Sequence, residues 1–260
     1  MRVFRLEWGR QVRSARAGVL FGLLVGFALV GVGWLAHRDA VGRPPFTGAD
    51  VGAFGALSYL ADAYWTGLVW ALVAGAFAAF GYVEDRVLGR TPYVVVRGVP
   101  AHAHAVARVL SSALVPAVIT AAAGLVAVGA ACALLPWQPF GAGGAGFPPA
   151  LELFERAPLL NDLLWCLLSA AQVAGLGCLA GLVGAVVANR LVVTIAPVVL
   201  VVLADLAQPA FLRGLNPVDG LVSATGADRV PWPVNVLFWL LVAAASAALA
   251  QSAARRRETT

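Results

Sequence analysis

The sequence predicts an all-α integral membrane protein: six transmembrane helices preceded by an N-terminal interfacial amphipathic helix. Hydrophobic residues make up 61% of the chain and charged residues only 12%. A soluble fold of 260 residues cannot bury that much apolar surface. Uncharged apolar runs also recur at roughly the 20-residue length that crosses about 30 Å of hydrocarbon. These two observations, together with an aromatic face near the N-terminus, set the fold class.

Residues 1–16 predict a helix lying in the cytoplasmic membrane interface. At about 100° per residue, Phe4, Trp8 and Val12 share one helical face, while Arg10 and Arg13 lie elsewhere around the helix. Such a helix places its aromatic side chains in lipid and its arginines among anionic headgroups. The alternative for this segment is a disordered basic leader.

The six spans are apolar runs bounded by polar or turn-forming residues. We expect them at 17–36, 64–83, 109–135, 163–188, 191–207 and 234–250. The first is longer than the apolar region of a signal peptide, and no cleavage site follows, so we expect it to be retained. The fifth contains Pro197 and ends near Asp205, so a re-entrant pair of helices is the alternative there.

The arginines predict the orientation. An even number of spans puts both termini on one side, and most of the 18 basic residues, all of them arginine, fall on that side. The positive-inside rule therefore places both termini, the loop 84–108 and the basic tail 251–260 in the cytoplasm, with the spans in the cell (plasma) membrane. The net charge of +5 is then a topology signal, and no nucleic-acid partner is expected.

Composition excludes several activities. Lysine is absent from the sequence, so the chain has no Walker A lysine, no Schiff-base lysine and no Ser-x-x-Lys pair. His102 and His104 are two residues apart and point about 200° away from each other on a helix, so one face cannot chelate a metal. We therefore expect no catalytic, cofactor-binding or metal site, and a non-catalytic membrane subunit.

Two glycine ridges predict close helix packing. Gly18, Gly22 and Gly26 recur every four residues in the first span, and Gly177 and Gly181 do so in the fourth. In lipid, such small-residue ridges let helix backbones approach closely. The ridges fit packing within the bundle and packing between subunits equally well.

The loop after the second span is longer than a connector needs to be. It begins with Glu84 and Asp85, breaks at Gly89 and Pro92, and restarts as a helix near Pro100. Basic and apolar side chains alternate along it: Arg86, Arg90, Val94, Val95, Val96 and Arg97. A mixed basic and apolar projection is typical of a surface that docks onto a soluble partner.

The order of elements resembles the permease subunit of ABC-2 type transporters, the ABC exporter class also called type V. These permeases have an interfacial N-terminal helix, six spans and a cytoplasmic loop after the second span. The matching loop positions are Glu84, Gly89, Thr91, Pro92, Arg97, Pro100 and Arg108. "ANRLVVTIAPVVLVV" and "LNPVDGL" resemble the family's fifth span and its outer turn. Arg90, between Gly89 and Thr91, departs from the family's loop pattern.

The resemblance implies an ATP-driven exporter in which this chain is the dimeric membrane half. Two copies of a soluble ABC ATPase would bind ATP and Mg, and a second permease chain, identical or related, would complete the dimer. Residues 86–104 would form the coupling helix region, with Arg86, Arg90 and Arg97 contacting the ATPase and Val94–Val96 inserting into it. Glu84 and Asp85 would tie the loop to the N-terminal arginines.

The nearly uncharged spans favour a hydrophobic or amphipathic substrate for such an exporter. Two other functions stay open. An ion-coupled secondary carrier would need ionisable ligands near mid-depth, which the spans do not show. A non-transporting membrane scaffold or immunity protein would use the same bundle.

Overall fold

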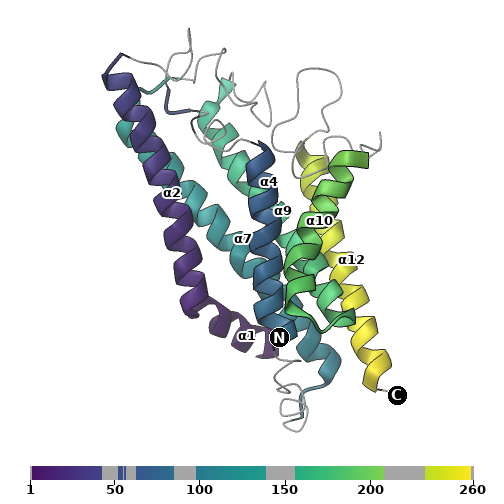
Figure 1. Ribbon diagram of the computed structural model, residues 1–260. Coiled ribbons are helices and arrows are strands. Elements are labelled where there is room, and N and C mark those ends of the chain that lie inside the picture. Colours follow the sequence, from purple (N-terminus) through teal and green to yellow (C-terminus); the bar gives the residue numbers. More distant parts are fainter. Residues whose placement is uncertain are drawn as a thin grey trace.

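The computed structural model describes residues 2–42, 52–54, 56, 63–84, 98–138, 156–207 and 232–258. Its elements are all helices, which confirms the predicted all-α class for this part of the chain. They are α1 (Arg2–Val12), α2 (Ala15–Ala40), α4 (Ala63–Ala78), the π-helical turn η1 (Ala79–Val83), α7 (Ala101–Leu134), α9 (Pro158–Val186), α10 (Arg190–Ala207) and α12 (Trp232–Glu258). Figure 1 shows α1 crossing the end of the bundle at which α12 also finishes.

Within these described ranges, four helices are long and apolar enough to cross a membrane: α2, α7, α9 and α12. Helix α4 with η1, and helix α10, contain shorter apolar stretches, Leu68–Gly81 and Arg190–Leu203. Length and composition therefore identify the chain as a membrane protein.

Helix boundaries differ from the predicted spans mainly at two places. Helix α7 begins at Ala101, next to Pro100, where the sequence predicts that a helix restarts, so its first two turns precede the predicted third span. Helix α12 runs to Glu258, so most of the predicted tail continues the last span as helix. Residues 101–108 and 251–258 contain no glycine or proline, so the helix continues through both polar segments next to the apolar runs.

Ser14 separates the N-terminal helix from the first long helix. Its hydroxyl accepts a hydrogen bond from the Ala17 amide and donates one to the Gln11 carbonyl at 2.6 Å. Ser14 is therefore the N-cap of α2, which begins at Ala15, and α1 has already ended at Val12. Arg16, which the sequence groups with the N-terminal segment, consequently lies in the first turn of α2.

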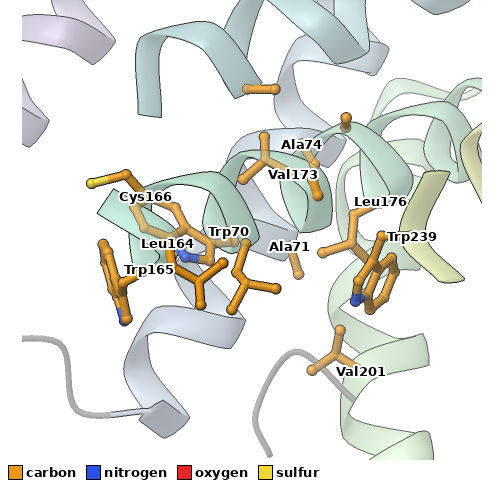
Figure 2. Close-up of a cluster of buried hydrophobic side chains, with 14 of the residues drawn as sticks. Trp70, Ala71, Ala74, Leu164, Trp165, Cys166, Val173, Leu176, Val201 and Trp239 are labelled. Atoms are coloured by element: carbon orange, nitrogen blue, oxygen red, sulfur yellow. The ribbon is translucent and has the colours of Figure 1, made fainter. Parts of the chain in front are cut away.

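Helix α9 is the centre of the bundle and packs against α4, α7, α10 and α12. Two glycines let it approach α7 closely: a Cβ atom on Gly177 would lie 2.8 Å from Ala113 Cα, and one on Gly181 would lie 2.8 Å from a Val109 methyl. Large side chains fill the space on its other sides, as Figure 2 shows for Trp70 and Trp239.

Candidate functional site: a charged network where α4 ends

Helix α4 ends in the π-helical turn η1, close to Glu84, after which the described residues break off. In η1, the Glu84 amide donates to the Ala79 carbonyl, which closes the final turn. Phe80 and Gly81 are the next two residues after Ala79, so their carbonyl groups lie in this last turn. Helix ends carry unsatisfied carbonyls and a partial negative charge, so they attract cations.

Two arginines from other helices bind these carbonyls. Arg16 of α2 donates to the Phe80 carbonyl at 3.1 Å, and its guanidinium carbon lies 4.4 Å from the centre of the Phe80 ring. Arg108 of α7 donates to the Gly81 carbonyl at 2.9 Å. The end of helix α4 is thus held by α2 and by α7.

Arg108 is the most deeply placed charge at this end, with its side chain 2% exposed. Its guanidinium also donates to the Glu7 carboxylate of α1 at 2.8 Å, across 101 residues of sequence. A charge taken out of water needs such partners, because an unpaired buried ion is very costly. The Arg108–Glu7 pair therefore fastens α1 to the start of α7.

Glu84 is the second anionic centre. It accepts from Arg16 at 3.1 Å, and a nitrogen of Arg190 at the start of α10 lies 3.9 Å from it. Arg16 is half exposed, so this pair is worth less than the buried one. We call Glu7, Arg16, Glu84, Arg108 and Arg190 the charged network; it joins α1, α2, η1, α7 and α10.

Gly81 lets these elements approach closely. A Cβ atom there would lie 2.9 Å from Ser112 Cβ and 3.2 Å from Gln11 Nε2. Gln11 is buried, so α1 lies directly against η1 and α7 at this point. The glycine is therefore required by packing, and it leaves its own carbonyl open to Arg108.

Of the predicted coupling residues, the structure describes Glu84 and places it at the point where the loop begins. Glu84 pairs with an arginine of the N-terminal segment, Arg16, as expected for it. The other predicted loop residues lie outside the described residues: Asp85, Arg86, Gly89, Arg90, Pro92, Val94, Val95, Val96 and Arg97.

Of the predicted interfacial residues, Phe4, Trp8, Arg10 and Val12 lie on α1, and Arg13 follows the last residue of that helix. The rings of Phe4 and Trp8 have centroids 6.0 Å apart and are half-buried, while Val12, Arg10 and Arg13 are exposed. Sequence reasoning missed Glu7, although it is the one acidic residue among the arginines of segment 1–16. That isolated acid was the available signal for an ion pair.

The two glycine ridges have different surroundings. Gly177 and Gly181 pack against α7 inside the bundle, whereas a Cβ atom on Gly18, Gly22 or Gly26 would have no described neighbour within 4 Å. The second ridge is therefore used by the chain itself. The first faces outward from the described part of the chain.

No group of three or more His, Cys, Asp or Glu side chains that could hold a metal occurs among the described residues. Cys132, Cys166 and Cys178 are free thiols, and the last two are buried. His104 is buried in the second turn of α7.

Comparisons with known proteins assign no function to the chain, so a function has to be inferred from the contacts of the charged network. No protein-family model matches the chain, and a search of curated proteins finds no match. The charged network, at the end of the bundle where α1 lies, is the most elaborate polar arrangement in the described part of the chain.

Proposed function

We propose that this chain is the permease subunit of an ATP-driven ABC exporter in the cell membrane. It crosses the membrane six times, with both termini in the cytoplasm, and works as a dimer on two soluble ATPase subunits. The observation that carries the proposal is the charged network around Glu84. Through Glu84 and Gly81 it ties the end of η1, where the loop begins, to α2, α7 and α10, and the Arg108–Glu7 pair adds α1.

A coupling loop has to move membrane helices when its partner pulls or pushes it, so its base needs rigid attachments. Glu84 is held by Arg16 of α2, and the adjacent Gly81 carbonyl is held by Arg108 of α7. A displacement of the loop therefore reaches α2 and α7 through short polar contacts. Charge-assisted hydrogen bonds of this kind are stronger than neutral ones and fix geometry.

Helix α1 has a defined part in this proposal. The Glu7–Arg108 pair makes it move with α7, while Phe4 and Trp8 anchor it in the membrane interface. The outward ridge of Gly18, Gly22 and Gly26 is available to the second permease chain.

The functional experiment compares loop variants in the presence of a co-expressed soluble ABC ATPase from the same gene cluster. Arg97→Glu and Val95→Asp should leave the chain inserted and folded but reduce ATPase co-purification, because losing one interface anchor costs about 2 kcal/mol or more. Arg255→Glu, on the exposed end of α12, is the matched control. Normal capture of the ATPase by both loop variants would refute the coupling role.

A topology experiment tests the placement independently. In a chain whose native cysteines are replaced, cysteines at Ala49 and Gly144 should react with an impermeant thiol reagent from outside. Cysteines at Val94 and Ser252 should react only after the membrane is opened. Labelling of position 252 from outside would require an odd number of spans.

One observation favours an ion-coupled carrier as the second candidate. Asp162, near the start of α9, is 2% exposed, so a carboxylate does lie inside the bundle. Buried acids in membrane helices often mark ion pathways. Transport by Asp162→Asn that persists with ATP and without an ion gradient would exclude this candidate.

A further inference from the structure

Five polar side chains are buried in the apolar core of the bundle without a hydrogen bond from any described residue. Ser169 Oγ and both amide atoms of Gln172 lie on α9, and both residues are fully buried. The other atoms are Thr120 Oγ1 on α7 and the indole nitrogens of Trp70 on α4 and Trp239 on α12. We call these five residues the polar layer.

Helix contacts place the polar layer near the middle of α9. Gly177 lies against Ala113 and Gly181 against Val109, so α7 and α9 run antiparallel, and Thr120 is level with the turn that contains Ser169. Trp239 lies against Gly175, one turn from Gln172. Trp70 belongs to the same apolar cluster as the neighbouring residues of α9, and Figure 2 shows Trp70 and Trp239 towards opposite ends of that cluster.

The helical wheel separates two sides of α9. Gly177 and Gly181 face α7, and Gly175 faces α12. At about 100° per residue, Ser169 and Gln172 are about 60° apart, and Gln172 lies about 140° from Gly177, on the side of α9 away from α7. Ser169 lies about 80° from Gly177, beside the side that faces α7. Thr120 belongs to α7 and approaches α9 from that helix.

Burying the Gln172 amide without hydrogen bonds lowers the stability of the folded chain. An amide moved out of water without hydrogen bonds is strongly disfavoured, and native proteins rarely leave such groups unpaired unless water, an ion or a ligand satisfies them. Gln172 offers a donor and an acceptor, Ser169 offers both, and an indole nitrogen offers a donor. No charged residue of the described helices lies in this layer, so an ionic ligand would gain no counter-charge.

We propose that Gln172 and Ser169 bind the neutral polar group of an amphipathic ligand, such as an amide or a hydroxyl on an apolar body. Apolar side chains of the surrounding cluster, including Ala71, Leu168 and Val201, would contact the apolar body. The identification of this ligand as a transported substrate rests on the proposed function. The proposed hydrogen bonds to a neutral polar group do not depend on that function. Water offers the same hydrogen bonds, so the test has to separate the two occupants.

The experiment uses the full chain, purified in lipid nanodiscs, and two photoreactive alkyl-diazirine probes that differ only in a terminal primary amide. The amide probe should label peptides of α4 and α9, and excess dodecanamide should suppress that labelling while dodecane should not. In Gln172→Met, suppression should need about fivefold to tenfold more dodecanamide, the effect of losing one or two neutral hydrogen bonds. Ser169→Ala should show a smaller shift of about fivefold or less.

Ser246→Ala is the matched control, because it removes a buried hydroxyl of α12 that lies outside the polar layer and should leave the competition unchanged. Equal labelling by the amide and alkane probes, or equal competition in Gln172→Met and the parent chain, would overturn the site and leave water as its only occupant. Neither result depends on an ATPase. Failure of this site and failure of the coupling role are therefore distinguishable.

Discussion

The charged network and the polar layer are both buried, yet they satisfy their polar groups in opposite ways. In the network, the Arg108 guanidinium has a carboxylate and a helix-end carbonyl within hydrogen-bond distance. In the layer, both amide atoms of Gln172 have no hydrogen-bond partner among the described residues. Paired charges hold helices in fixed positions, whereas polar groups without a hydrogen-bond partner remain able to bind a ligand or water. The contrast separates a structural junction from a site held open at a cost in stability.

Breaking the Glu7–Arg108 pair should have the largest effect. Glu7→Leu leaves Arg108 buried without its carboxylate, which should lower the free energy of unfolding by about 3–5 kcal/mol. Thermal unfolding of the purified chain measures the loss. Arg10→Gln removes an exposed partner of the same carboxylate and should change little. Recovery of stability in Glu7→Leu/Arg108→Met would show that the unpaired charge is the cause, and no loss in Glu7→Leu would contradict the junction.

The glycine ridges provide the next contrast. Gly177→Ala forces a Cβ atom against the α7 backbone and should destabilise the chain by about 1–3 kcal/mol. Gly22→Ala meets no described atom and should be close to neutral in the monomer. Unfolding measurements on both variants test the difference. Equal destabilisation would mean that the α2 ridge is also packed, and loss of dimer cross-linking in Gly22→Leu would identify it as the subunit contact.

A substitution in the polar layer should raise the stability of the chain, whereas the substitutions in the charged network and in the α9 glycine ridge lower it. Gln172→Met removes two unpaired buried polar atoms while keeping a similar side-chain volume, so it should stabilise the ligand-free chain by about 1–2 kcal/mol. A melting temperature several degrees above that of the parent chain would agree with this. A lower melting temperature would show that bound water or a hidden partner already satisfies the amide.

The exposed Arg16–Glu84 pair should give the smallest effect on stability. Arg16→Gln should cost about 0–1 kcal/mol, because the arginine is half exposed and solvent screens the pair. Raising the salt concentration should reduce the difference from the parent chain. A loss as large as that in Glu7→Leu would mean that the Phe80 carbonyl cap, rather than the ion pair, dominates at Arg16.

The membrane helices were predictable because lipid imposes a local rule on the sequence. A helix that crosses hydrocarbon needs roughly 20 uncharged residues in succession, and hydropathy detects such a run without any knowledge of its neighbours. The helix cap at Ser14 placed Arg16 in α2, because a cap depends on single hydrogen bonds that hydropathy does not detect. The restart of the helix near Pro100 was predicted correctly.

The sites were less predictable, because their contacts join residues far apart in the chain. Arg108 was recognised as part of a loop pattern, but nothing local indicates that it is buried and paired with Glu7. Gln172 was unremarkable within an apolar run, since its missing partners are a property of the surrounding helices. For Glu84, the resemblance to ABC-2 permeases implied a tie to the N-terminal arginines, and the structure pairs this carboxylate with Arg16 of α2.

The sequence by itself indicated the class of protein and the helices that the structure describes, because these follow from local hydropathy. The placement of the arginine-rich side in the cytoplasm follows from the positive-inside rule and stays a prediction. Only the tertiary structure decided which of two similar glycine ridges is packed, which arginine is buried and which polar side chains are left unpaired. Those properties depend on the register and facing of neighbouring helices. Such relations arise only when segments 60 to 100 residues apart come into contact.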